Sequence, residues 1–176
     1  INLYGKFVVA DQGGINIKNG IWYDSSLNPT RGLSIIGTDG MTLQSTGANQ
    51  DIDVAGGITV MAATRDGLTL KSANNINVSG LIDAGGELNL VANKLVDIKN
   101  DTTVGGSLYA SGTMITAQDI TNTGLTTLLG QGNVNAVSVE NVTNSGAFTA
   151  NANNVSANSI TSTGGLVSVD AKQFDV

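Results

Sequence analysis

The sequence predicts an all-β fold, a right-handed parallel β-helix with about 20 residues per coil and three short strands per coil. Two observations support this prediction: apolar residues recur at a fixed step, and short strand motifs repeat between turn residues. The recurring apolar positions, at steps of 20, 20, 20, 20 and 19 residues, are Leu68, Leu88, Leu108, Leu128, Phe148 and Val167. A fixed period of this size is typical of stacked structural repeats, which bury a core only by contact with their neighbours.

The first part of the chain, residues 1–66, is expected to form irregular coils with insertions. Its strand motifs alternate apolar and polar residues and follow Gly or Asp, which is typical of short half-buried strands. These motifs are 14–17, 32–35, 40–43, 51–54 and 57–60. From Ile15 to Met41 is 26 residues and from Met41 to Leu68 is 27. If these positions are equivalent, each early coil carries about six or seven extra residues.

The first insertion, residues 19–31, contains the only Trp and the only Pro of a chain with 4% aromatic residues. Aromatic side chains and Arg are common anchors of protein or sugar recognition. Within this Trp22–Arg31 loop, the candidate receptor-binding residues are Trp22, Tyr23, Pro29 and Arg31. The alternative is that the loop covers the open end of the solenoid and Trp22 caps the core, because a solenoid end needs a cap.

The second part, residues 67–176, is expected to form regular coils that continue the same solenoid. The second strand of each repeat is predicted at 76–78, 95–98, 115–117, 134–136, 155–157 and 174–176. The third is predicted at 81–84, 102–104, 120–122, 142–144 and 160–162. Side chains expected to face water are Asn77, Asp97, Thr116 and Asn135. Some of the corner residues Asn74, Asn93, Asn133 and Asn154 are expected to point inward and hydrogen-bond along the stack.

The competing fold is a β-sandwich, which is also built of strands joined by Gly-rich turns. Sandwich strands are usually longer and their sequence has no fixed period, so the β-helix is favoured. The chain lacks an initiator Met and ends within a predicted strand, so we expect a fragment of a longer protein.

Composition narrows the classes of function. The net charge is −6 and only 12% of residues are charged, so a nucleic-acid surface with clustered Lys and Arg is not expected. Without His or Cys, the chain lacks the residues of common catalytic triads and transition-metal sites. We therefore expect no enzyme activity, no cofactor and no metal site. No apolar run is long enough to predict a membrane-spanning helix.

The repeat units resemble the haemagglutinin repeats of filamentous haemagglutinin-like exoproteins of two-partner secretion systems. That family includes large adhesins and contact-dependent growth-inhibition toxins. The resemblance covers roughly residues 32–176 and rests on units such as 86–92 and 75–80, together with their period. It implies a β-helix that an outer-membrane transporter exports to the bacterial surface. The expected partner is then a protein or glycan receptor on a host or neighbouring cell.

Two further patterns bear on function. Asp51 and Asp53 should share one strand face, which polysaccharide-cleaving β-helices use for acidic clusters; the simpler interpretation is two solvated strand positions. The residues expected to stack into an outward threonine ladder are Thr121, Thr143 and Thr161. The sequence thus favours a structural and adhesive segment of a secreted surface fibre, with receptor binding expected in its irregular part. The alternative is a carbohydrate-active β-helix, either a polysaccharide lyase or hydrolase or a phage tailspike fragment.

Overall fold

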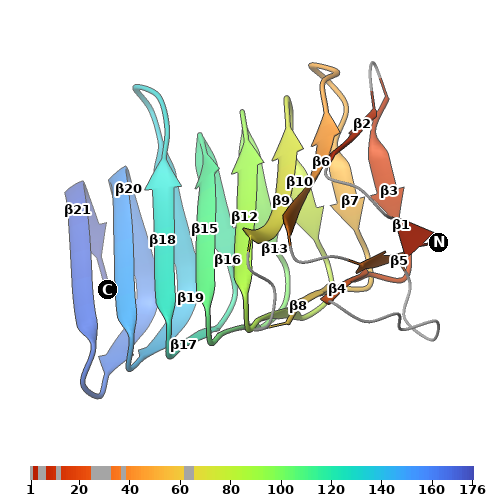
Figure 1. Cartoon of the computed structure of the whole chain (residues 1–176). Helices are drawn as coiled ribbons and strands as arrows, with labels where there is room; N and C mark the ends of the chain where they lie inside the picture. Colours follow the sequence, from red (N-terminus) through yellow and green to blue (C-terminus); the bar gives the residue numbers. More distant parts are fainter. Residues whose placement is uncertain (1, 4–6, 11–12, 25–32, 37–38, 62–65) are drawn as a thin grey trace.

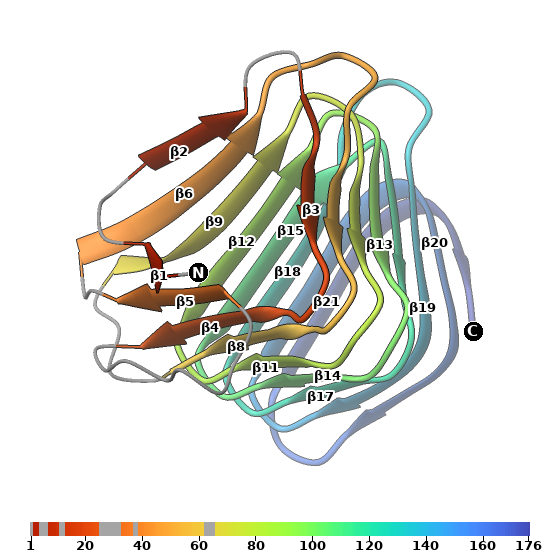
Figure 2. The same ribbon diagram turned by 90° about the vertical axis from the view of Figure 1, so that its right-hand side faces the viewer.

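The computed structural model describes residues 2–3, 7–10, 13–24, 33–36, 39–61 and 66–176. Within these ranges the chain forms strands and turns and no helix. Every strand pairing is parallel, and successive coils stack along one axis into a solenoid with three faces (Figures 1 and 2). This is the predicted right-handed parallel β-helix with coils of about 20 residues.

Each face is a sheet that receives one strand from each coil. Face 1 contains β2 (Phe7–Ala10), β6 (Asp39–Ser45), β9 (Asp66–Ser72), β12 (Glu87–Ala92), β15 (Ser107–Gly112), β18 (Leu125–Gly130) and the first parts of β20 (Ala147–Ser162) and β21 (Leu166–Asp175). Face 2 contains β3 (Ile15–Ile17), β7 (Ile52–Val54), β10 (Ile76–Val78), β13 (Leu95–Ile98), β16 (Met114–Ala117), the first part of β19 (Ala136–Asn144), the middle of β20 and the end of β21. Face 3 contains β1 (Asn2–Leu3), β5 (Leu33–Ile36), β4 (Ile21–Asp24), β8 (Ile58–Val60), β11 (Ile82–Ala84), β14 (Thr102–Val104), β17 (Ile120–Asn122) and the last parts of β19 and β20.

The core forms because these strands are too short to bury a face alone. Stacking coils about 4.8 Å apart pairs each backbone N–H and C=O with a neighbouring coil. On face 1, Leu68 pairs with Leu88 and Leu88 with Leu108, and all three side chains are at most 1% exposed. Inward side chains thus line up in columns of equivalent residues. On face 3, the strands predicted at 102–104 and 120–122 match β14 and β17 residue for residue.

One column differs from its prediction at Leu128. The observed register pairs Leu108 with Thr126, and Thr126 with Phe148. These steps are 18 and 22 residues, so a short coil followed by a long one produced the apparent period of 20. Leu128 is still buried, because a shift of two residues along a strand keeps a side chain on the same face.

The second strand of the same coil also starts later than predicted. Residues 134–136 were expected to form it, but β19 begins at Ala136 and Val137 is the residue that pairs with Ile115. Val134 is 81% exposed and lies in the turn that precedes this strand. This turn is the tall cyan loop between β18 and β19 in Figure 1. The extra turn residues account for the long coil.

The N-terminal coil has a different register from the predicted one. Ile15 pairs with Ile52 on face 2 and is not equivalent to Met41, which lies on face 1. The step is therefore 37 residues, and the additional chain includes β5. That strand pairs with β4 on the side away from β8, and β1 pairs with β5 in turn. Face 3 therefore extends beyond β4 at the N-terminal end (Figure 2).

The corner asparagines follow the prediction only in part. Asn74 is buried, whereas the other three predicted corner residues, Asn93, Asn133 and Asn154, are exposed. Asn135 was expected in water but is 8% exposed. Its side chain donates to the backbone carbonyl of Gly132 at 2.7 Å and accepts a hydrogen bond from the backbone N–H of Asn153. These hydrogen bonds of the inward Asn135 side chain stabilise the long turn.

An inward amide pair, Asn122 and Asn144, lies where face 3 meets face 1. Asn122 Nδ2 donates to Asn144 Oδ1 at 2.7 Å, and both side chains are at most 1% exposed. Asn144 Nδ2 donates to the backbone oxygens of Gly146 at 3.0 Å and Leu166 at 3.2 Å. The pair therefore satisfies carbonyl groups at turns of successive coils, which an apolar side chain cannot do.

Candidate functional site

The predicted aromatic site is divided between the inside and the outside of the solenoid. Trp22 and Tyr23 lie in β4, where successive side chains point to opposite faces of the sheet. Tyr23 is 1% exposed and belongs to the core, and its hydroxyl accepts a hydrogen bond from the backbone N–H of Gly40 at 3.0 Å. Tyr23 is therefore not available at the surface. Pro29 and Arg31 lie outside the described residues.

Trp22 is half-buried on the outer side of face 3, in a strand and not in a loop. It lines a groove of about 300 Å³ at the corner between face 2 and face 3. Three successive coils contribute to this groove, with Asn19, Thr59, Leu81 and Asp83 among the other lining residues. The strand register places Trp22 beside Thr59 and Thr59 beside Asp83. Of the predicted receptor-binding residues, Trp22 is the one that the structure places at a described surface groove.

Glycines shape this corner because the coils approach closely there. Gly20 and Gly57 have φ values of 86° and 88°, a conformation that residues with a Cβ rarely adopt. A Cβ on Gly57 would lie 2.3 Å from the carbonyl oxygen of Leu81, and one on Gly56 would lie 2.3 Å from the carbonyl carbon of Asn19. The groove floor is therefore backbone, flanked by the side chains of neighbouring strands.

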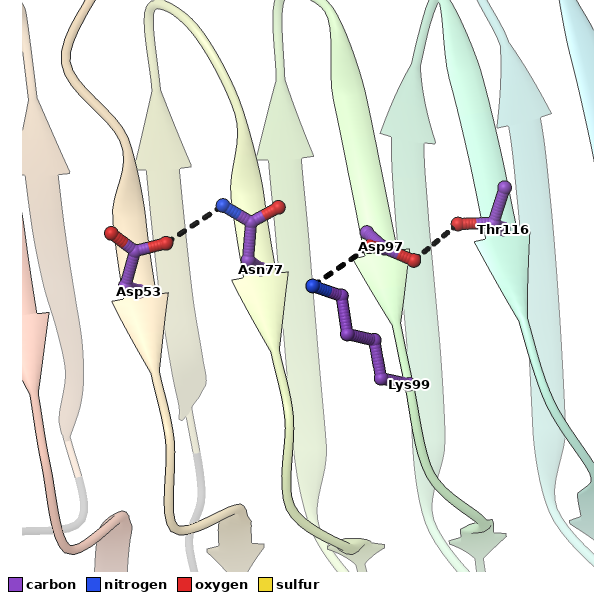
Figure 3. Close-up of polar contacts among 5 residues, drawn as sticks. All are labelled: Asp53, Asn77, Asp97, Lys99 and Thr116. Carbon is purple, nitrogen blue, oxygen red and sulfur yellow. Dashed lines mark hydrogen bonds and ion pairs between the residues drawn. The ribbon is translucent and has the colours of Figure 1, made fainter.

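The predicted acidic pair has partners in the next coil. Asp51 Oδ1 accepts hydrogen bonds from Asn74 Nδ2 at 2.6 Å and from the backbone N–H of Asn75 at 3.2 Å. Asp53 Oδ1 accepts one from Asn77 Nδ2 at 2.7 Å (Figure 3). Each carboxylate therefore links two coils, a structural use that does not require catalysis.

The same outer column of face 2 continues with a second linked pair (Figure 3). Thr116 Oγ1 donates to Asp97 Oδ1 at 2.6 Å, and Lys99 Nζ lies 3.5 Å from Asp97 Oδ2. Asn77, Asp97 and Thr116 lie on the outer side, as predicted, and each is partly buried by its neighbours. Donors and acceptors thus pair along the solenoid axis between coils.

Face 3 carries the predicted threonine ladder, extended by one residue. Thr121 pairs with Thr143, Thr143 with Thr161, and Thr103 precedes them in the same column. All four side chains are exposed. Asp83, Thr59 and Trp22 occupy the same outer column toward the N-terminus, so the ladder leads to the groove.

Sequence reasoning missed the groove and the inward amide pair. Leu81 was predicted as the start of a strand, but it is 60% exposed and β11 begins one residue later. The amide pair had a signal in the repeated Asn-x-Gly tails at 122–124 and 144–146, which mark equivalent corners. The groove had no comparable signal, because its lining residues come from three coils that are adjacent only after stacking.

Among the described residues, no cluster of three or more His, Cys, Asp and Glu side chains is arranged to bind a metal ion. The described part of the chain also has no helix with the length and apolar character needed to span a membrane. Comparisons with protein-family models, with curated proteins and with solved structures gave no match.

Proposed function

We propose that this chain is a structural and adhesive β-helical segment of a secreted bacterial surface fibre. In this role it extends a binding or toxin domain from the cell and contributes receptor contacts through its irregular N-terminal coils. The observation that supports the proposal best is the continuous stack, in which one inward core and parallel outer columns run through successive coils. Such a solenoid gains length with each added repeat, because each repeat contacts only its neighbours.

The outer columns support a structural role over the alternative of a carbohydrate-active β-helix. An active site of that kind needs carboxylates free to act on a substrate. Asp51 and Asp53 instead accept hydrogen bonds from the next coil, and Asp97 is held by Thr116. The resemblance of the repeats to filamentous haemagglutinin-like exoproteins adds the expected location, the outer bacterial surface. It also implies an outer-membrane transporter as the export partner.

The experiment is surface labelling of the cells that naturally produce the parent protein. An antibody raised against this chain should label intact cells, and deletion of the candidate transporter should abolish that label. Electron microscopy should place the label away from the outer membrane, since a stalk holds its coils outside the cell. Label that appears only after the cells are permeabilised would overturn the proposal.

A further inference from the structure

The groove beside Trp22 combines an aromatic side chain with polar groups in one shallow site. Trp22 is half-buried and Leu81 is 60% exposed, so both offer apolar surface to a ligand. Asp83 supplies a carboxylate, and Thr59 supplies a hydroxyl from the neighbouring coil. Because successive coils are spaced about 4.8 Å apart, these groups form a row along the solenoid axis.

We propose that this groove binds a segment of a neutral glycan. The C–H face of a sugar ring packs against Trp22 and Leu81, while ring hydroxyls donate to Asp83 and exchange hydrogen bonds with Thr59. A carboxylate acceptor favours ligands rich in hydroxyl donors, and apolar side chains beside it favour ligands with a flat apolar face. Sugars present both kinds of surface within one ring.

The charge of the groove indicates whether it would bind neutral or acidic glycans. Among the groove-lining residues none is Lys or Arg, and the charged side chain present is Asp83. The whole chain carries a net charge of −6. A sialylated or sulfated glycan would therefore be repelled by the groove and by the molecule as a whole. This charge distribution selects the neutral class.

The threonine column gives a longer glycan a path out of the groove. Thr103, Thr121 and Thr143 continue the outer column that contains Asp83 and are exposed. A glycan chain that leaves the groove along the solenoid axis meets one hydroxyl per coil. Longer neutral oligosaccharides should therefore bind more tightly than disaccharides of the same sugar.

The rigid backbone floor explains why such a site is preformed. Gly20, Gly56 and Gly57 hold the corner in a shape that side chains with a Cβ would disrupt. A ligand that binds there orders few additional groups, so little conformational entropy is lost. The volume of about 300 Å³ lies at the lower end of the range for small-ligand sites, roughly 300–1,000 Å³, and suits a short segment of a chain.

The test is a glycan array printed with neutral oligosaccharides and their sialylated and sulfated forms, followed by titration of the bound neutral glycan. Wild type should bind neutral glycans. Trp22→Ala should weaken binding at least about tenfold and Asp83→Asn about fivefold, since both remove direct contacts. The matched control is Tyr109→Ala, an outward aromatic on face 1, which should bind as wild type. Circular dichroism checks that each variant remains folded.

Three results would overturn the inference: no bound glycan, preference for acidic glycans, or unchanged binding by both groove variants. Cell binding that survives periodate oxidation of surface glycans yet is lost in Trp22→Ala would instead identify a protein ligand. The inference rests on the proposed adhesive role, but different results would overturn the glycan site and the adhesive role. A surface-labelled fibre that binds no neutral glycan overturns the groove assignment alone, whereas label confined to permeabilised cells overturns the proposed function.

Discussion

At the scale of single residues, large and small side chains alternate between the two inward columns of face 1 near Phe148. Thr126 and Leu128 occupy one coil, and Phe148 and Ala150 occupy the next. A large side chain in one column thus stands beside a small one in the other. Near Phe148 this exchange keeps the core closely packed, whereas earlier coils bury two large residues in these positions, as with Leu88 and Leu90.

Thr126 allows the cost of one buried hydroxyl in this core to be measured. Its side chain is 0% exposed, and Oγ1 has no hydrogen-bond partner among the described residues. Valine has nearly the same shape and removes the unpaired hydroxyl, so Thr126→Val should stabilise the protein by about 1–2 kcal/mol. Chemical denaturation measures this change. A loss of stability would mean that the hydroxyl is satisfied in solution.

The inward and outward assignments make a second prediction. Leu88→Asp should destabilise the fold by more than about 4 kcal/mol, because an unpaired carboxylate would enter an apolar column. Thr143→Asp is the control, since Thr143 is exposed in the column of face 3, and its cost should stay within about 0.5 kcal/mol. Thermal melts followed by circular dichroism rank the two variants. The reverse order would place the wrong side chains inside.

At the scale of elements, the corners decide how strands stack. In the N-terminal coils, the corner between face 2 and face 3 uses glycines where two coils touch through their backbones, at Gly20, Gly56, Gly57 and Gly80. The corner between face 3 and face 1 also has close glycine approaches, as at Gly124 and Gly146, and adds Asn122 and Asn144, whose amides reach backbone carbonyls. At a bend, backbone N–H and C=O groups can lose their strand partners. Glycines let the coils approach closely enough for backbone hydrogen bonds, and the asparagine amides donate to carbonyls that remain.

The glycine corner predicts a graded series of alanine variants. Gly57→Ala should cost the most, because a positive φ of 88° combines with a Cβ 2.3 Å from a carbonyl oxygen. Gly132 has a φ of 90° and open space around its Cβ position, so Gly132→Ala should cost only the backbone strain, about 1–2 kcal/mol. Gly164→Ala, with neither constraint, should be close to neutral. Urea titration of all three tests the order; equal effects would refute the close approach at Gly57.

The amide pair predicts a large effect of a small truncation. Asn144→Ala removes three hydrogen bonds, those with Asn122 and with the carbonyls of Gly146 and Leu166. Since these groups are buried, the expected cost is about 2–4 kcal/mol. Asn154→Ala is the control, because Asn154 is exposed, and it should change stability little. Comparable losses from both variants would contradict a specific role for the inward amides.

At the scale of the whole molecule, stability comes from contacts between neighbouring coils. The strands pair with the coil before and the coil after, as β12 does with β9 and β15. Removal of one full coil should therefore leave a foldable chain, provided that the join preserves the register. The molecule behaves as a stack whose length can change without a change of fold.

Deletion of residues 88–107 tests this property, because it joins Glu87 to Leu108 and keeps both in equivalent positions. The shortened protein should retain the circular dichroism spectrum of a β-helix and unfold cooperatively with somewhat lower stability. Deletion of residues 88–97 is the control: it removes half a coil, so strands of different faces would be forced to pair. A folded half-coil variant with unchanged stability would contradict the three-face register.

Apolar alternation and turn residues act locally, so they were enough to predict the class of fold and most strand positions. Strands such as 76–78, 95–98 and 120–122 match their predictions residue for residue. The sequence also singled out Trp22 as a surface candidate and Asp53 as an outward residue.

The stacking of the coils was needed to establish the register near Leu128, the pairing of Ile15 and the placement of β5 beyond β4. It also separated Tyr23 from Trp22 and assembled the groove with Asp83. The physical reason is that register depends on the lengths of turns and on contacts between residues one coil apart. A period of two along each strand tolerates a shift of two residues without exposing the core, so apolar patterning alone cannot distinguish the two registers.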